Sequence, residues 1–330
     1  MDPDVWVPLL LPLAAWPLAR VVAPRLPPRA ASWLLTAGCL VLAAASTATL
    51  TLQAFTGLTL VPAVARAGHW STEALGSVKP VNVPVAIGCG LLLAALGGAF
   101  TRAAVRYARW SVALTRELDD HEQAAGVIIL RGKEPVAFST PSRGGRIAIS
   151  TGMLDALGPA EREALLAHER AHLRLGHHRF LIAVTLAAAL NPLVRPLCSA
   201  ARFALERWAD EAAAAHIGNR AVVATAVAKA ALAGRAEPGF ALAATGGPVP
   251  RRVAALLAAP ARRLPAALLS AALVLGVTGW SAQTVLDAAT DLHQDLESAQ
   301  DRTAHRDPSD ASGHVSPRAN PLGQVDETGG

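Results

Sequence analysis

The chain contains stretches that are too long and too apolar for an ordinary soluble fold. No acidic or basic residue occurs in 30–65 or in 264–286, and further apolar stretches cover 5–24 and 81–101. A helix needs about 20 mostly apolar residues to cross the hydrocarbon part of a bilayer. We therefore predict four transmembrane helices at 5–24, 33–58, 81–101 and 264–286, the first three within residues 1–104. The start of the chain lacks the basic region of a signal peptide, so the first helix is expected to stay as an anchor.

Charge and composition support this interpretation and set an orientation. Charged residues make up 17% of the chain, whereas soluble domains carry about 25%. The net charge of +5 also fits a nucleic-acid-binding protein, but the basic residues flank the apolar stretches and form no single stripe. Basic residues in short loops favour the cytoplasmic side of a membrane. Three clusters of basic residues lie beside the apolar stretches: Arg20, Arg25 and Arg29; Arg102, Arg106, Arg109 and Arg116; and Arg251, Arg252, Arg262 and Arg263.

These clusters predict a multi-pass protein of a bacterial-type plasma (inner) membrane. Both termini are expected outside the cell and residues 105–263 in the cytoplasm. The lipid bilayer is an expected partner, and direct binding of nucleic acid is not expected. The three cysteines form no CxxC pair, so neither a disulfide framework nor a thiolate zinc site is predicted.

The segment between the third and fourth spans has the pattern of an α+β domain. Residues 127–130, 136–139 and 147–150 are expected to form short strands, the last two joined as a hairpin. Helices are expected from Pro159 to about Gly176, from Ser199 as the N-cap to His216, and over 220–233 and 251–257. Residues 287–330 are too polar for a core and are expected to form a mostly disordered extracytoplasmic tail after a few helical turns.

An HExxH pattern, formed by His168, Glu169 and His172, lies in the helix expected to start at Pro159. Two histidines four residues apart project from one helical face, so both imidazoles can reach one Zn²⁺ at about 2.0–2.1 Å. Glu169 is rotated by one residue and can act on a water beside the same ion. The pattern also occurs by chance, but an apolar stretch precedes it, as a buried site requires. We predict Zn²⁺ as cofactor, both histidines as ligands and Glu169 as the catalytic base.

A catalytic zinc site needs a third protein ligand and one open position. Glu206 and Asp210 are four residues apart on the expected helix 199–216, among alanines that indicate burial. We predict Glu206 as the third ligand. Asp210 is expected to hold a ligand histidine in the right tautomer. A solvated acidic face is the alternative interpretation of this pair.

The segment after the motif contains another candidate for the third ligand, His178, but the pattern around it does not fit. His178 has the offset used by metzincins, but that pattern needs glycine where Leu175 stands and a methionine further along the chain. His177, His178 and Arg179 are instead expected at the membrane interface. The apolar helix 180–190 is too short to span a bilayer, and a crossing would separate Glu206 from the two histidines. Residues 180–197 are therefore expected to dip into the membrane and return.

The stretch from Arg146 through His168-Glu169-Arg170-Ala171-His172, followed by Glu206-Arg207-Trp208-Ala209-Asp210, resembles the BlaR/MecR-type (antirepressor) integral membrane zinc metallopeptidases. It is similar, more distantly, to the HtpX-type membrane proteases. The resemblance implies a mainly α membrane protein with a cytoplasmic zincin-like domain between the third and fourth spans. It also implies a gluzincin-type site with His168, His172 and Glu206 as ligands and Glu169 as base. Antirepressor members carry a penicillin-binding sensor after the last span, where this chain has only 287–330, so direct β-lactam sensing is not expected.

The expected function is zinc-dependent hydrolysis of peptide bonds in a cytoplasmic or membrane-associated protein. The resemblance favours regulated proteolysis in signalling, with a transcriptional repressor as one possible substrate. A housekeeping protease for damaged membrane proteins and an inactive scaffold with a relic zinc site stay open as alternatives. Substrate pairing with an edge strand of the 136–150 hairpin is a further expectation. His216 and Arg220 are weak candidates for stabilising the oxyanion.

Overall fold

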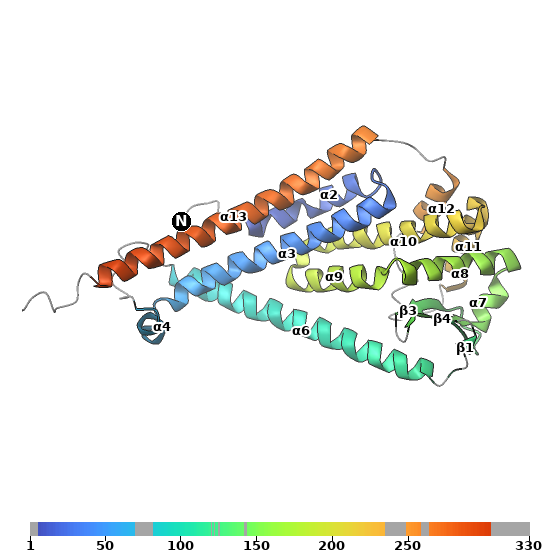
Figure 1. Ribbon diagram of the computed structural model, residues 1–330, viewed down its shortest axis with the longest axis horizontal. Coiled ribbons are helices and arrows are strands. Elements are labelled where there is room, and N and C mark those ends of the chain that lie inside the picture. Colours follow the sequence, from blue (N-terminus) through green and yellow to red (C-terminus); the bar gives the residue numbers. More distant parts are fainter. Residues whose placement is uncertain are drawn as a thin grey trace, which may run out of the picture.

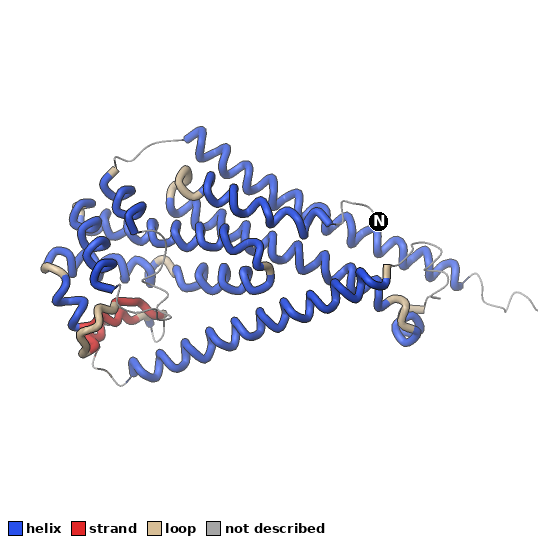
Figure 2. Tube along the Cα trace, turned by 180° about the vertical axis from the view of Figure 1, so that it is seen from behind, coloured by secondary structure: helices blue, strands red, loops and turns tan. Residues whose placement is uncertain are grey.

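The computed structural model describes residues 6–69, 82–119, 121, 123–124, 126–141, 144–234, 249–258 and 264–304. Three helices run along the length of the molecule: α3 (Pro28–Leu58), α6 (Val83–Asp119) and α13 (Leu264–Ala304) (Figure 1). One end holds a four-stranded sheet with α7 (Thr151–Ala156), α8 (Pro159–Arg174), α11 (Arg220–Ala233) and α12 (Val249–Leu257). The other end holds α4 (Pro62–Ala67) and the end of α13. The view from behind shows the sheet confined to one end of the long helices (Figure 2).

Within the described residues, three helices are long and apolar enough to cross a membrane: Pro28–Leu58, Val83–Asp119 and Leu268–Asp301. They correspond to the second, third and fourth predicted spans. The segment predicted as the first span forms α1 (Val7–Leu10), the 3-10 helix η2 (Leu11–Ala14) and α2 (Ala15–Val22). Its apolar helical part, Val7–Arg20, is shorter than a full span. Prolines at 8, 12 and 17 explain the interruptions, because proline removes a helical hydrogen bond and clashes with the preceding turn. The prediction of four spans is therefore not confirmed.

Two apolar helices continue into polar segments beyond the predicted spans. α6 runs on to Asp119, into the stretch from 105 onward that was assigned to the peptidase domain. α13 runs on to Ala304, in the stretch after residue 286 where a few helical turns were expected before a disordered tail. Neither extension contains glycine or proline. Extending an existing helix adds a hydrogen bond for each residue ordered, whereas starting one is unfavourable, so polar segments without breakers extend a helix readily. Residues 305–330 lie outside the described residues.

The sheet has the order β1-β2-β4-β3. Its strands are β1 (Gln123–Ala124), β2 (Val127–Leu130), β3 (Ala137–Thr140) and β4 (Arg146–Ser150). The predicted hairpin is confirmed, since β3 and β4 pair antiparallel, and β2 pairs with β4 in parallel, an arrangement not predicted. One face of the sheet buries Ile128 and Ala148 with Leu118 of α6. The other face buries Ile149 with Met153 and Leu165, so α7 and α8 are fixed against the sheet.

A tight turn joins α8 to α9 (His177–Leu190). α8 starts at Pro159 as predicted, and the Glu161 carboxylate accepts the N–H of Gly158 at 2.8 Å. After α8, Gly176 adopts a φ of 66°, a left-handed conformation that glycine takes without steric cost. α9 ends where Asn191 caps the 3-10 helix η4 (Pro192–Val194). The chain then returns as α10 (Arg195–Ile217), which starts four residues before the predicted N-cap at 199 because proline at 196 fits a first helical turn.

The hairpin of α9, η4 and α10 packs along α3. Near its start, the rings of Trp33 and Phe180 meet with centroids 4.7 Å apart. At its tip, Asn191 Nδ2 donates to Ser46 Oγ at 2.9 Å, and Ser46 Oγ lies 2.7 Å from the carbonyl oxygen of Pro8. Residues 33 and 46 of α3 are about 20 Å apart along the helix axis at 1.5 Å per residue. The hairpin therefore extends about 20 Å along a helix that is apolar enough to span a bilayer.

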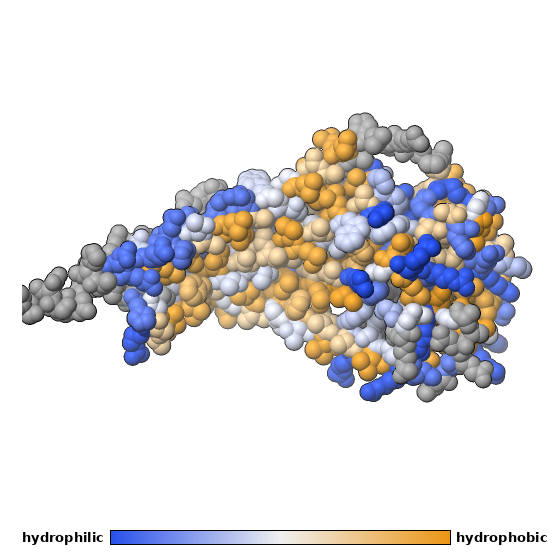
Figure 3. Space-filling view, in the orientation of Figure 1, coloured by the Kyte–Doolittle hydropathy of each residue, from blue (hydrophilic) through white to orange (hydrophobic). Residues whose placement is uncertain are grey.

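Small residues allow α3 to approach the other helices closely. A Cβ added at Gly38 would lie 3.4 Å from side-chain atoms of both Leu197 on α10 and Val274 on α13. Beside this contact, the Sγ atoms of Cys39 and Cys198 lie 3.2 Å apart, and both thiols are free and buried. In the space-filling view, apolar side chains cover the middle of the molecule and hydrophilic ones gather toward its two ends (Figure 3). This distribution is typical of a protein whose middle part faces lipid.

Candidate metal centre

Two neighbouring helices supply the residues predicted for the metal site. His168, Glu169 and His172 lie on α8, and Glu206 and Asp210 lie on α10. α8 and α10 pack side by side, and small buried alanines on both helices allow this close approach. Four of these five residues are buried, and the imidazole of His172 is nearly so. The structure therefore brings all five predicted site residues into one buried cluster.

The three predicted ligands have the spacing that one ion requires. Nε2 of His168 and Nε2 of His172 lie 3.1 Å apart, and they lie 3.6 and 3.5 Å from the two carboxylate oxygens of Glu206. One ligand atom from each residue falls within 4.8 Å of the others. Tetrahedral ligands at about 2.0–2.1 Å from one Zn²⁺ lie about 3.3 Å from each other. The donor set of two imidazoles and one carboxylate therefore fits a single zinc ion.

Glu169 has a carboxylate oxygen available beside this cluster. The residue is buried, and its Oε2 has no hydrogen-bond partner among the described residues. Its charge acts on His172 and on Arg252, which indicates that it faces the same site. A buried carboxylate without a partner is unfavourable, so this oxygen is suited to binding a water or a substrate group.

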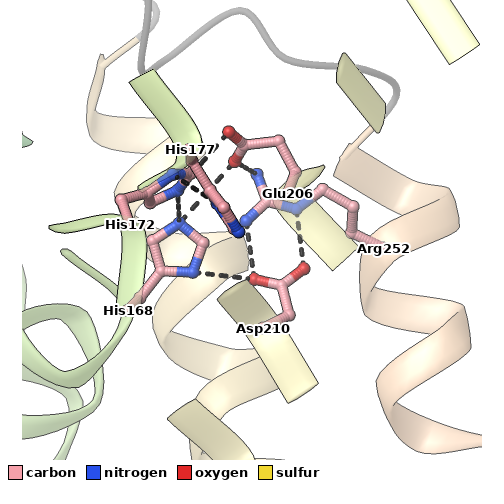
Figure 4. Close-up of polar contacts among 6 residues, drawn as sticks. All are labelled: His168, His172, His177, Glu206, Asp210 and Arg252. Carbon is pink, nitrogen blue, oxygen red and sulfur yellow. Dashed lines mark hydrogen bonds and ion pairs between the residues drawn. The ribbon is translucent and has the colours of Figure 1, made fainter. Parts of the chain in front are cut away.

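Asp210 contacts the ligand histidine and is held in turn by Arg252 (Figure 4). Asp210 Oδ1 lies 3.0 Å from Nδ1 of His168, the ring nitrogen that points away from the predicted metal position. Arg252 donates to both oxygens of Asp210, at 2.7 and 2.8 Å, and its Nη1 lies 2.9 Å from Glu206 Oε2. The guanidinium is buried with them. Arg252 thus neutralises two buried carboxylates, which would otherwise be costly to remove from water.

Sequence reasoning did not identify Arg252. It lies on α12, 42 residues after Asp210, and was read only as part of a basic cluster beside the fourth span. Charge balance could have indicated that a cation was missing, because two buried carboxylates on one helical face need more positive charge than two neutral imidazoles provide. No spacing rule, however, selects Arg252 over its neighbour Arg251.

The pKa values of the metal-free site follow from this arrangement. Burial alone would lower the pKa of His168, but Asp210 and Glu206 outweigh it and raise the pKa to about 10. Burial lowers the pKa of His172. Burial would raise the pKa of Glu206, but Arg252 and His172 bring it down to about 2. The carboxylates are therefore ionised at neutral pH, as metal ligands must be.

His177 is also part of the cluster, a contact that was not predicted. Its place at a membrane interface stays a prediction. The side chain is completely buried, and its Nδ1 lies 3.0 Å from Nδ1 of His172. Burial, together with His172, lowers the pKa of His177 to about 3, so the ring is neutral. Its ring packs at 5.0 Å from the ring of Trp208. The next residue, His178, is only half buried.

The two weak candidates for stabilising the oxyanion lie outside the metal cluster. Arg220 binds the carboxylate of Glu211 and donates to the carbonyl oxygens of Ala255 and Leu256 at the end of α12. His216 is exposed near the end of α10. Arg220 therefore joins α11 to α12, and neither side chain takes part in the metal cluster.

An HExxH helix packed against a carboxylate-bearing helix defines the class of the site as that of a metallopeptidase. Residues 111–204 match the family model described as Peptidase family M48. This match includes the HExxH motif and ends two residues before Glu206. The comparison therefore supports a metalloprotease and covers the α8 half of the site.

The chain is also similar to a named protease. It is 39% identical over 67 residues to Protease HtpX homolog 2 of Methanosarcina mazei, an alignment that covers 20% of this chain and 22% of that protein. The chain thus spans about a fifth of the length of this relative. No solved structure matches the chain significantly. These findings support the HtpX-type resemblance, and the BlaR/MecR resemblance stays a prediction.

Proposed function

We propose that the protein is a membrane-embedded zinc-dependent endopeptidase that hydrolyses peptide bonds of cytoplasmic or membrane-associated proteins. The observation that carries this proposal is the buried cluster of His168, His172 and Glu206, with ligand atoms spaced for one ion. The carboxylate of Glu169 beside the cluster supplies the base that a peptidase needs. The match to Peptidase family M48 supports the reaction class.

Zn²⁺ is the proposed cofactor, held by the two imidazoles and by Glu206. When bound there, it would polarise a peptide carbonyl group and make water a stronger acid. The protein's own groups prepare this site before any ion binds. Arg252 keeps the Glu206 carboxylate ionised, and Asp210 binds Nδ1 of His168, so that Nε2 is the nitrogen that would bind the ion.

Glu169 is the proposed general base. Its free Oε2 can accept a proton from an attacking water and later donate that proton to the leaving amine. Burial of the site limits competing water and strengthens each of these charge interactions. With Glu169 as the base, the proposed mechanism needs no other titratable group at the reacting carbonyl group.

The proposed location of the site is at the cytoplasmic membrane surface. α10 carries Trp208, and the guanidinium of Arg29, at the start of α3, lies 5.9 Å from its ring centroid. Arg29 belongs to a cluster of basic residues, which favours the cytoplasmic side. From this level the α9–α10 hairpin continues about 20 Å along α3, consistent with the predicted dip into the membrane.

Peptide binding is proposed at β3. Among the described strands, β3 has one neighbour, β4, so it is an edge of the sheet. It also packs against α8, the helix that carries the HExxH motif. A peptide segment that adds to a sheet edge gains backbone hydrogen bonds without sequence specificity, which suits a protease.

The proposal is tested with purified full-length protein. Glu169→Gln should keep one zinc ion per chain and lose proteolysis of an unfolded protein substrate, whereas His168→Ala should lose both. Glu163→Gln, an exposed glutamate on the same helix, is the matched control and should behave as wild type. Full proteolytic activity in Glu169→Gln, or wild-type protein without bound zinc, would contradict the proposal.

The biological role needs a separate experiment. Regulated signalling predicts one or a few cleaved proteins, such as a transcriptional repressor, whereas quality control predicts many membrane substrates. Comparing protein fragments in cells that express wild type or Glu169→Gln distinguishes these roles. The similarity to a protease named as an HtpX homolog supports proteolysis in either role.

A further inference from the structure

We propose that His177 is the positioning residue for His172: it accepts a hydrogen bond from Nδ1–H of His172 and so leaves Nε2 of His172 free for the metal. This inference rests on the proposed zinc centre and adds a residue to it. The resulting site has one outer partner for each ligand histidine, Asp210 for His168 and His177 for His172.

The geometry limits the pair to two protonation patterns. Nδ1 of His172 and Nδ1 of His177 lie 3.0 Å apart, so one of these nitrogens donates a proton and the other accepts it. If His177 donates, a neutral His172 carries its own proton on Nε2, and that nitrogen cannot bind a metal. If His172 donates, its Nε2 is free. Only the second pattern is compatible with the ligand role of His172.

Burial supports a dedicated role for His177. The side chain has no exposed surface, and its Nε2 lacks a hydrogen-bond partner among the described residues. An unsatisfied buried polar group destabilises a fold by about 1–3 kcal/mol. An apolar residue at this position would avoid that penalty, so the Nδ1 contact to His172 is the feature that distinguishes histidine here.

The local chain path places the ring with little freedom. His177 is the first residue of α9, directly after the left-handed turn at Gly176, so the new helix starts over the last turn of α8. The ring then packs against Trp208 of α10 and Phe180 of α9, with centroids 5.0 and 6.4 Å away. The rings of His172 and His177 lie next to each other (Figure 4), with centroids 4.8 Å apart, and the ring of Trp208 packs against His177.

The two outer partners differ in chemistry. Asp210 is a carboxylate bound to Arg252, whereas His177 is an imidazole that accepts through a ring nitrogen. A carboxylate acceptor increases the basicity of an imidazole ligand more than a neutral acceptor does. We therefore expect His177 to contribute mainly orientation and tautomer selection to zinc binding.

The test replaces His177 with amide side chains of two lengths, so that the oxygen that accepts the hydrogen bond lies in a different place in each variant. The Oδ1 of asparagine can occupy the position of histidine Nδ1, whereas the longer glutamine reaches the position of Nε2. His177→Asn should keep the zinc dissociation constant within about threefold of wild type. His177→Gln and His177→Phe should raise it about tenfold or more, in the range found for outer partners of metal ligands. His178→Phe, the same change one residue away, should leave it unaltered.

The measurements use full-length protein in detergent. Zinc affinity is determined by competition with a chromophoric chelator, and the visible spectrum of the Co²⁺-substituted protein reports ligand geometry. Melting temperatures of the metal-free variants show whether each one folds. The inference is supported if Asn matches wild type and Gln weakens binding and alters the Co²⁺ spectrum. Equal zinc affinity in wild type, His177→Gln and His177→Phe would overturn it. Wild-type protein that binds no zinc would instead overturn the proposed function.

Discussion

Arg252→Met removes the guanidinium that contacts Glu206 and Asp210, two of the buried carboxylates of the metal centre. Methionine keeps most of the length and the apolar part of the side chain, so the change isolates the charge. Glu206 and Asp210 are only 4% and 1% exposed. In the metal-free protein, His168 would remain as the charged partner of both, because its pKa is raised to about 10.

The expected loss of stability is large for a single substitution. Removing one partner of a buried ion pair destabilises a protein by about 3–5 kcal/mol. A chain of this size loses about 2 °C of melting temperature per kcal/mol, so the metal-free variant should melt about 6–10 °C below wild type. Saturating Zn²⁺ should recover part of this difference, because the ion replaces the countercharge that Glu206 has lost.

The assay is thermal unfolding in detergent with a metal chelator, followed by fluorescence of the seven tryptophans. Arg251→Met is the matched control, since Arg251 is exposed and only covers the ring of Phe203 at 5.0 Å. It should change stability by about 0.5 kcal/mol or less. Arg252→Lys should fall between the two, because a point charge cannot form the two parallel bonds to Asp210. Equal effects of Arg251→Met and Arg252→Met would refute the reasoning.

Three further changes have defined outcomes. At a zinc concentration of 100 times Kd, binding contributes about 2.7 kcal/mol to the stability of wild type. Removing this zinc with a chelator should therefore lower the melting temperature by about 5 °C. His168→Ala should show no zinc-dependent shift in melting temperature. Asn191→Ala loses the bond to Ser46 and the cap of η4, so its free energy of unfolding should fall by about 1–3 kcal/mol; the exposed cap variant Asn219→Ala should lose only about 1 kcal/mol. Gly176→Ala should destabilise by about 1–2 kcal/mol, since the φ of 66° is unfavourable for alanine, while its added Cβ meets nothing closer than 3.9 Å.

Local patterns carried the predictions that the structure confirms. The start of α8 at Pro159 and the bounds of α11 at 220–233 follow from first-turn proline, capping and apolar spacing. The break after residue 190 follows from Asn191-Pro192. The side-by-side placement of the HExxH helix and the Glu206 helix was also anticipated, because four-residue spacing puts each pair on one helical face.

Long-range features could not be predicted in the same way. Arg252 binds Asp210 although the two residues are 42 positions apart in the sequence, and the parallel pairing of β2 with β4 depends on the whole sheet. His177 was assigned to an interface because histidine beside an apolar helix is polar, and only tertiary contacts with His172 and Trp208 reveal its burial. The sequence also does not show how far polar residues without breakers continue an apolar helix, as in α6 and α13.

The neighbouring thiols of Cys39 and Cys198 offer a direct probe of how α3 and α10 pack together. Residues 159 positions apart in the sequence present sulfur atoms 3.2 Å from each other, one on α3 and the other on the hairpin that leads to Glu206. A thiol-bridging metal such as mercury, added to native membranes, would tie these two segments together. After Cys89→Ser removes the third thiol, the bridged chain should migrate as a compact species on a denaturing gel. The packing of α3 against α10 can thus be tested in cells without purifying the protein or introducing a label.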